Sequence, residues 1–269
     1  MKNQKISILG TGWLGLPLAQ YLQEKGYQVK GSTTSSHKIQ QLRDLDIQPY
    51  LIRIDENGIG ENNESFFDAD VLIITVPPAR NINRFLMIIQ TAVSFIKKYQ
   101  IRNIIYTSST GVYGNVSGLV DETFPLQPLR VSSEAIVKAE QVLQDLTANL
   151  TILRLGGLAG GDRKAGRFLA GRQDVKQGNA PINMLHQVDG VRVIGAIIMG
   201  DHWNKIYNVC AGLHPSRHDF YTAQAKKQSL QPPSFAPDQK GISNYKTIDN
   251  SKLKQDLNYT FLFNDPMMF

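Results

Sequence analysis

Short apolar runs alternate with longer stretches of helical periodicity through the first 155 residues of the chain. The runs are rich in Ile, Val, Leu, Tyr and Thr, which is typical of strands. Strands are predicted near residues 5–9, 27–31, 49–54, 70–75, 102–107 and 150–155, and helices near 13–25, 36–44, 82–98 and 131–147. Strands that alternate with helices favour a parallel sheet with both faces covered. We therefore expect an α/β fold, a Rossmann doubly wound parallel sheet with strand order 3-2-1-4-5-6 and a ligand crevice at the carboxyl ends of the strands.

The alternation weakens after Gly156. Residues 156–181 are rich in Gly and in basic side chains, and weaker elements follow them. These are a helix near 187–200, a strand near 205–209, and helices near 216–230 and 249–257. We expect residues 1–155 to form a dinucleotide-binding Rossmann domain. Residues 156–269 are expected to form a small C-terminal substrate lobe that packs on it and does not fold independently.

Three glycines mark the first strand-to-helix turn. Gly10, Gly12 and Gly15 form a G-x-G-x-x-G pattern between the apolar run Ile6–Leu9 and an amphipathic stretch. In a dinucleotide site the first Gly allows the tight turn, the second lets the backbone approach a pyrophosphate, and the third lets the helix pack against the strand. Helix N–H groups and the helix dipole then hold the phosphates. The pattern predicts a nucleotide site; the alternative is a tight turn without a ligand.

The end of the second strand indicates which nicotinamide cofactor fits. An NAD site usually carries Asp or Glu about 20 residues after the glycines, where it binds the ribose 2′-hydroxyl. This chain has no acidic residue between Lys25 and Arg43, and hydroxyls and a lysine stand there instead. Because a carboxylate would repel a 2′-phosphate that hydroxyls and a cation accept, we expect NADP to be preferred over NAD. Ser35 or Ser36 could equally cap the next helix.

Composition disfavours several other classes of protein. Hydrophobic residues make up 42% of the 269 residues, so the chain can bury a core and disorder is not expected. The single cysteine, Cys210, cannot form an internal disulfide, and no metal-ligand set is evident. The apolar N-terminal stretch is broken by glycines and runs into polar residues, unlike a signal peptide. We expect a cytoplasmic protein with no metal, no membrane span and no nucleic-acid partner.

The net charge is +6, and most basic residues are scattered. One dense cluster lies in the C-terminal lobe and consists of Arg163, Lys164, Arg167, Arg172 and Lys176. Since a planar guanidinium pairs well with phosphate, we expect Arg163 and Arg167 to bind a small anionic metabolite. The alternative, of about equal weight, is a solvated helix face. Little aromatic interleaving accompanies the cluster, which disfavours nucleic acid.

Three further motifs carry a family resemblance. The fourth strand runs into Ile73-Ile-Thr-Val-Pro-Pro78, the fifth into Ser108-Ser-Thr-Gly-Val-Tyr-Gly114 and then Asp121-Glu-Thr-Phe-Pro125, and the sixth into Leu153-Arg-Leu-Gly-Gly157. With the N-terminal glycines, these motifs resemble the extended and atypical short-chain dehydrogenase/reductases of the NAD-dependent epimerase/dehydratase type. Members of that family bind NAD(P) and act on nucleotide sugars and related metabolites. The resemblance covers most of the chain and is strongest through residue 160.

The resemblance implies positions for the cofactor and for the reaction. Cofactor contacts fall on Gly10, Thr11, Gly12, Trp13, Leu14, Gly15, Thr33, Thr34, Ser35, Lys38, Val76, Pro77 and Ser108. The family uses a Ser or Thr after the fifth strand, a Tyr, and a Lys four residues after that Tyr. Ser109 and Lys138 match the first and the last, but Glu134 stands at the Tyr position. Glu134 is a poor proton donor to an alkoxide at neutral pH, and Tyr113, the nearest other phenol, has a place in the turn that favours a structural role.

Substrate contacts are implied at Asn183 and His186. His186 and Asp189 resemble the family's H-x-x-D, with helix capping as the alternative for this pair. Two functions follow from these observations. The first is an NAD(P)-dependent oxidoreductase or epimerase of a small metabolite such as a nucleotide sugar. The second is a non-catalytic NADP-binding sensor or scaffold that kept the fold without the family tyrosine; a homodimer is left open in both.

Overall fold

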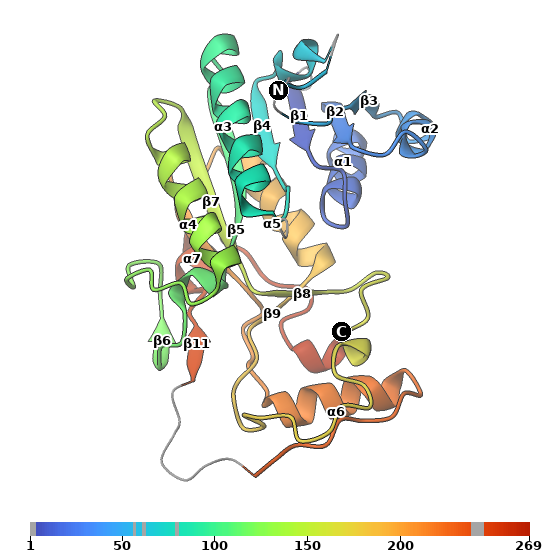
Figure 1. Ribbon diagram of the computed structural model, residues 1–269, viewed down its shortest axis with the longest axis vertical. Coiled ribbons are helices and arrows are strands. Elements are labelled where there is room, and N and C mark those ends of the chain that lie inside the picture. Colours follow the sequence, from blue (N-terminus) through green and yellow to red (C-terminus); the bar gives the residue numbers. More distant parts are fainter. Residues whose placement is uncertain (1–3, 56–57, 61–62, 79–80, 238–244) are drawn as a thin grey trace. The chain divides into compact units, whose positions relative to one another are not determined.

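The computed structural model describes residues 4–55, 58–60, 63–78, 81–237 and 245–269. Contacts divide the chain into two compact units, each made of several segments. Figure 1 shows the chain coloured along its sequence. The sheet unit contains residues 1–112, 128–153 and 191–206, and the second unit contains residues 113–127, 154–190 and 207–269. The expected domains, 1–155 and a dependent lobe 156–269, stay a prediction, because they concern independent folding rather than contacts.

A seven-stranded sheet forms the centre of the fold. Its strands are β1 (Lys5–Leu9), β2 (Gln28–Thr33), β3 (Gln48–Leu51), β4 (Val71–Ile74), β5 (Asn103–Ser109), β7 (Asn149–Leu155) and β10 (Ile206–Val209). Their order is β10-β7-β5-β4-β1-β2-β3, and Ile6 of β1 pairs in parallel with Val29 of β2 and Val71 of β4. The expected Rossmann α/β fold and strand order are therefore confirmed. The strand predicted near 205–209 adds a seventh position to the expected six.

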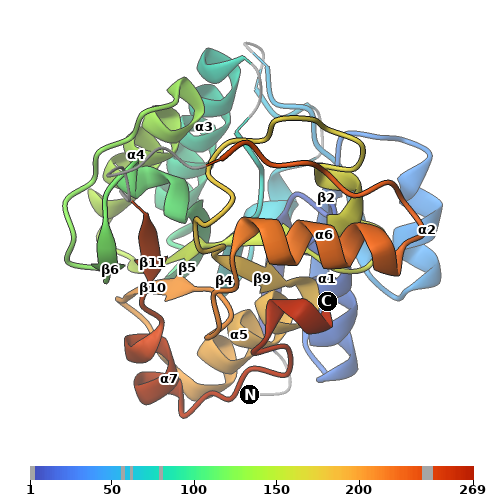
Figure 2. The ribbon, with the colours of Figure 1, turned by 90° about the horizontal axis from the view of Figure 1, so that it is seen from below.

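Helices cover both faces of this sheet, which explains the nearly continuous apolar sequence of its inner strands. They are α1 (Gly15–Glu24), α2 (Lys38–Asp44), α3 (Ile82–Tyr99), α4 (Val131–Gln144) and α5 (Gln187–Gly200). α3 packs on α4, and Figure 2 shows this pair away from α1 and α5. α1 and α5 approach closely, since a Cβ at Gly195 would overlap the Tyr21 ring. Among the described residues, no helix is long and apolar enough to cross a membrane.

The second unit contains smaller elements. They are β6 (Gly118–Val120), β8 (Gly157–Ala159), β9 (Met184–His186), α6 (Arg217–Lys227), β11 (Lys246–Ile248), α7 (Ser251–Leu257) and the short 3-10 helices η3 (Ala165–Phe168) and η4 (Pro266–Met268). β6 pairs with β11 and β8 with β9, both in parallel. These strands have only three residues each, too few for a period-2 pattern to predict them. α6 and α7 lie inside the ranges predicted from the sequence.

Candidate functional site

The glycine turn after β1 gives each of its glycines a different environment. A Cβ at Gly15 would overlap the carbonyl oxygen of Gly10, so the start of α1 can reach the strand only without a side chain. Gly10 has a φ of +106°, which favours glycine. Gly12 is exposed, and a Cβ there would meet no heavy atom within 4 Å. The space beside Gly12 is therefore open to a ligand, and the fold itself does not require glycine at this position.

The turn is fixed to its neighbouring strands by hydrogen bonds. Gly10 N donates to Ser32 Oγ at 2.9 Å, and the backbone N and Oγ1 of Thr11 donate to the Ser32 carbonyl at 2.8 and 2.7 Å. Thr75, after β4, donates from Oγ1 to the Gly10 carbonyl at 2.6 Å. The Val76 side chain lies beside Gly10 as well. Sequence reasoning missed Ser32 and Thr75, although each is a small polar residue at the end of a strand adjacent to the turn.

Among the described residues, no side chain caps the N-terminus of α1. The N-cap residue, Leu14, makes no side-chain capping bond, and the first turn contains no acidic residue. Trp13 is half-buried and Leu14 is buried, so both contribute backbone and packing to the turn. Uncapped helix N–H groups beside the open Gly12 fit an anion. This arrangement suits the pyrophosphate of a dinucleotide.

The residues after β2 present hydroxyls and cations. Thr33 Oγ1 accepts from Ser35 N at 3.1 Å, which holds the loop, while Thr34 is exposed. Lys38 begins α2 and is partly exposed. The exposed guanidinium of Arg53 donates from Nε to the Thr34 carbonyl at 2.9 Å. Sequence reasoning missed Arg53, because only the sheet order brings the residue after β3 next to the end of β2. The donor set fits a 2′-phosphate.

The two serines at the end of β5 have different partners. Ser108 is buried, and its hydroxyl donates to the carboxylate of Glu140 on α4, so its side chain serves the packing of that helix. Ser109 is partly exposed, and its Oγ accepts from Gly111 N at 3.0 Å. A Cβ at Gly111 would lie 3.2 Å from Ser109 Oγ and 3.1 Å from Ser133 Oγ on α4. A second hydroxyl, which the sequence did not single out, therefore lies beside Gly111.

The other residues expected in catalysis lie elsewhere. Glu134 and Lys138 are exposed on α4, whereas the buried side of that helix carries Ser133, Ile136 and Glu140. Because both side chains are exposed, burial cannot tune either of them for proton transfer. The hydroxyl of α4 that lies beside Gly111 belongs to Ser133, next in sequence to the residue at the expected tyrosine position. A catalytic role for Glu134 and Lys138 stays a prediction without support from this geometry.

Tyr113 belongs to a buried network of the second unit. Its hydroxyl donates to Asn208 Oδ1 at 2.8 Å and accepts from Arg154 at 3.0 Å. Glu122 accepts from Asn208 N at 2.7 Å, so the D-E-T motif and the V-Y-G turn meet in one structure. Burial raises the pKa of Tyr113, and the Arg154 guanidinium partly opposes this rise. The phenol is engaged as donor and acceptor, which agrees with the structural role that its position favours.

The expected substrate residues of the second unit also have defined partners. Asn183 uses both ends of its amide on β11, donating to the Lys246 carbonyl at 3.0 Å and accepting from Ile248 N at 2.8 Å. Asp189 is fully buried and accepts from Tyr259 and from two backbone N–H groups, so it fixes the C-terminal segment. Arg163 and Arg167 are exposed, and Arg163 lies over the Phe168 ring. Asn183 and Asp189 are therefore packing residues.

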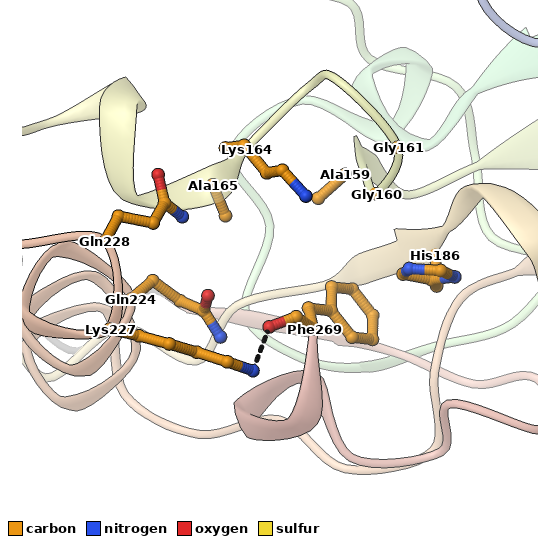
Figure 3. Close-up of a pocket in the computed structure, with 10 residues that line it drawn as sticks. All are labelled: Ala159, Gly160, Gly161, Lys164, Ala165, His186, Gln224, Lys227, Gln228 and Phe269. Carbon is orange, nitrogen blue, oxygen red and sulfur yellow. Dashed lines mark hydrogen bonds between the residues drawn. The ribbon is translucent and has the colours of Figure 1, made fainter.

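His186 lines a cavity of the second unit. Its ring stacks on Phe263 with centroids 3.7 Å apart and meets the edge of Phe269. Val188 N donates to Nδ1 at 3.3 Å, which leaves Nε2 toward Gly160. Burial lowers the pKa of His186, Asp189 opposes this change and Lys164 adds to it. The other lining residues come from β8, η3, α6 and Phe269, all in the second unit (Figure 3). No group of acidic, His and Cys side chains in the described ranges has the geometry of a metal site.

Comparison with known proteins agrees with the geometry of the glycine turn. Residues 10–183 match the family model for NAD(P)H-binding proteins. The chain belongs to this NAD(P)H-binding family. It is 34% identical over 271 residues to Protein YeeZ of Escherichia coli strain K12, with 98% of each chain covered. Binding of NAD or NADP, expected from the sequence, is thereby confirmed at the level of the family.

Solved structures show the same fold. A functionally unknown conserved protein from Silicibacter pomeroyi DSS superposes with a TM-score of 0.80 at 22% identity, covering 98% of this chain and 96% of that one. UDP-glucuronic acid 4-epimerase from Bacillus cereus, in complex with NAD, gives a TM-score of 0.79 at 18% identity with the same coverage. These neighbours confirm the fold that the resemblance to short-chain dehydrogenase/reductases of the epimerase/dehydratase type implies.

Proposed function

We propose that this protein is an NADP-dependent oxidoreductase of the epimerase/dehydratase type that acts on a small anionic metabolite. The observation that carries the proposal is the open space beside Gly12 at the uncapped N-terminus of α1. A nicotinamide cofactor bound there supplies hydride transfer. Thr34, Lys38 and Arg53 provide donors for the 2′-phosphate and no carboxylate that would repel it.

The residues at the end of β5 are proposed to act on the substrate oxygen. Ser109 is partly exposed, and Ser133 adds a second hydroxyl beside Gly111. Hydroxyl donors aimed at a carbonyl oxygen stabilise the negative charge that hydride addition places there. The similarity in fold to the Bacillus cereus UDP-glucuronic acid 4-epimerase, whose structure contains NAD, supports a substrate related to the sugar nucleotides.

A non-catalytic NADP-binding sensor or scaffold is the second candidate. The environment of Tyr113, a phenol considered for the reaction, favours this candidate. Tyr113 is fully buried and hydrogen-bonded to Asn208 and Arg154. A sensor needs the cofactor site and does not need a proton relay. The two candidates therefore make the same prediction for binding and opposite predictions for turnover.

One experiment separates them. The protein is titrated with NADPH by calorimetry and then incubated with NADPH carrying deuterium at the transferred position and a panel of carbonyl metabolites, including sugar nucleotides. Deuterium in a product, detected by mass spectrometry, supports the oxidoreductase. Tight NADPH binding without transfer to any member of the panel supports the sensor. Failure to bind either NADPH or NADH contradicts both.

A further inference from the structure

The second unit contains a cavity of about 250 Å³, separate from every residue assigned above to the cofactor. The space exists because one wall is made of small residues. Ala159, Gly160, Gly161 and Ala165 contribute almost no side-chain volume to it. Gly160 has a φ of +113°, and a Cβ there would lie 2.6 Å from Nε2 of His186. The loop after β8 can therefore lie directly against the histidine ring only as glycine.

Two basic side chains line the cavity. Lys164 and Lys227 line it, and no acidic side chain does. Figure 3 shows Lys164 on one side and Lys227, with Gln224, on the opposite side. The Lys227 ammonium donates to the terminal main-chain oxygen of Phe269 at 2.7 Å, so this lysine already has a partner. Lys164 is exposed, and its charge contributes to lowering the pKa of His186. Lys164 is the cation best placed to pair with a ligand.

Two glutamines line the cavity, Gln224 of α6 and Gln228 directly after it. Gln224 is 2% exposed, and its Nε2 donates to the carbonyls of Pro266 and Met267 at 3.3 Å each. These two carbonyls fix the orientation of the amide, because only the NH₂ end can face them. Its oxygen is thus left for the cavity. Gln228 has a buried Oε1 with no hydrogen-bond partner among the described residues. This oxygen is buried away from the cavity, so Gln228 lines the cavity with other atoms of its side chain.

The remaining surface is apolar. The Phe269 ring and the methyl groups of Ala159 and Ala165 complete the lining, and both alanines belong to the hydrophobic cluster under η3 and β9. A carbon skeleton can contact this surface while its charged group meets Lys164. The volume lies below the roughly 300–1,000 Å³ of ordinary small-molecule sites. A complete nucleotide sugar is therefore too large to lie inside.

We propose that this cavity binds a small hydroxylated organic anion, a phosphate or carboxylate no larger than a sugar monophosphate. Lys164 pairs with the anionic group, and Gln224 accepts a hydrogen bond from a hydroxyl group. The inference rests on the proposed function only in taking this anion as the substrate or as part of it. It places anion recognition at Lys164 rather than at Arg163 and Arg167, which do not line the cavity.

Calorimetric titration of the full chain tests this, with glucose 1-phosphate, gluconate, glucose and inorganic phosphate as probes at matched low salt. We expect glucose 1-phosphate or gluconate to bind and glucose to bind at least tenfold more weakly. Lys164→Gln should weaken anion binding about five- to tenfold, a modest factor because the lysine is exposed. Lys176→Gln, which removes an exposed lysine outside the cavity, should change nothing. Equal affinity for glucose and the anions, or equal effects of the two lysine variants, overturns the proposal.

A second variant separates this proposal from the proposed function. Ala165→Leu places a larger side chain into the cavity and should abolish anion binding while leaving NADPH binding unchanged. If that variant fails to fold, Lys164→Gln still decides the matter, because it alters an exposed side chain. The titrations need no cofactor. A protein that binds NADPH but none of the anions contradicts the cavity proposal alone, and one that binds the anions but no nicotinamide cofactor contradicts the function alone.

Discussion

The hydroxyl oxygens of Ser109 and Ser133 both lie within 3.2 Å of the point where a Cβ of residue 111 would stand. One comes from the end of β5 and the other from the first turn of α4. Gly111 therefore keeps open a small space with two hydroxyls on its border. If the protein is an enzyme, this pair takes the place of the single serine expected from the sequence.

Ser109→Ala should lower turnover by roughly 10²-fold, because it removes a donor to the developing alkoxide. Ser133→Ala should lower it by a smaller factor, and the affinity for NADPH should change little in both. Steady-state rates and NADPH titrations measure these effects, with Gln141→Ala on the exposed side of α4 as the control. Full turnover in both serine variants would remove the pair from the mechanism. Loss of turnover in Glu134→Gln or Lys138→Ala would instead restore the residues expected from the sequence.

The glycines of the first turn should respond differently to substitution. Gly12→Val should abolish cofactor binding with little change in the melting temperature, because a side chain there meets only the ligand space. Gly15→Ala should destabilise the fold by about 1–3 kcal/mol or more, since its Cβ overlaps the Gly10 carbonyl. Calorimetry with NADPH and thermal unfolding separate the two effects. Unchanged NADPH binding by folded Gly12→Val would contradict the pyrophosphate site.

Arg53 should contribute to cofactor choice. Arg53→Gln removes a guanidinium that stands beside the Thr34 carbonyl. We expect it to weaken NADPH binding about tenfold, the effect of losing one charge-assisted contact, and to leave NADH binding unchanged. Titrations of both cofactors at matched salt measure the ratio of the NADPH and NADH dissociation constants. The control is Arg43→Gln, which removes an exposed arginine from the last turn of α2. Equal losses for both cofactors would place Arg53 outside the 2′-phosphate site.

Tyr113→Phe should act on stability. It leaves Asn208 Oδ1 without its phenol donor and removes one acceptor of Arg154. A buried acceptor that loses its donor costs about 1–3 kcal/mol. Urea unfolding should show this loss, while the NADPH dissociation constant stays the same. A variant with native stability but no turnover would instead assign the phenol to the reaction.

His214 should make stability depend on pH. Burial lowers the pKa of His214, whose Nδ1 lies 2.9 Å from the Ile182 carbonyl. The unfolded chain therefore binds more protons than the folded one near pH 6, so the contribution to stability is present above about pH 6.5 and is lost as the pH falls below it. Thermal unfolding between pH 8 and pH 5 should show a shallower loss in His214→Gln than in the wild type. The matched control, His37→Gln, removes an exposed histidine; if it flattens the curve equally, the explanation is wrong.

The sheet and its glycine turn could be predicted because each rests on local sequence. Long apolar strands and a G-x-G-x-x-G turn have strong periodic and steric signatures, and both are found where expected. The partners of side chains could not be predicted in the same way. Arg53 reaches Thr34, and Asn183 reaches β11, only through the order of the strands. On α4, the rotation of the helix determines which side chains are buried. Glu134 is exposed, whereas Ser133, one position earlier, is buried.

The interleaving of the two units has a consequence for synthesis. Neither unit is one continuous stretch: the sheet unit needs residues 191–206, and the second unit needs residues 207–269. When residues up to 190 have left the ribosome, both units are therefore still incomplete. Until β10 emerges, β7 is an edge strand with unpaired backbone groups, the kind of surface that recruits strands from other chains. The nascent protein is thus most exposed to aggregation late in translation, and slow codons or chaperones would matter most between β7 and β10.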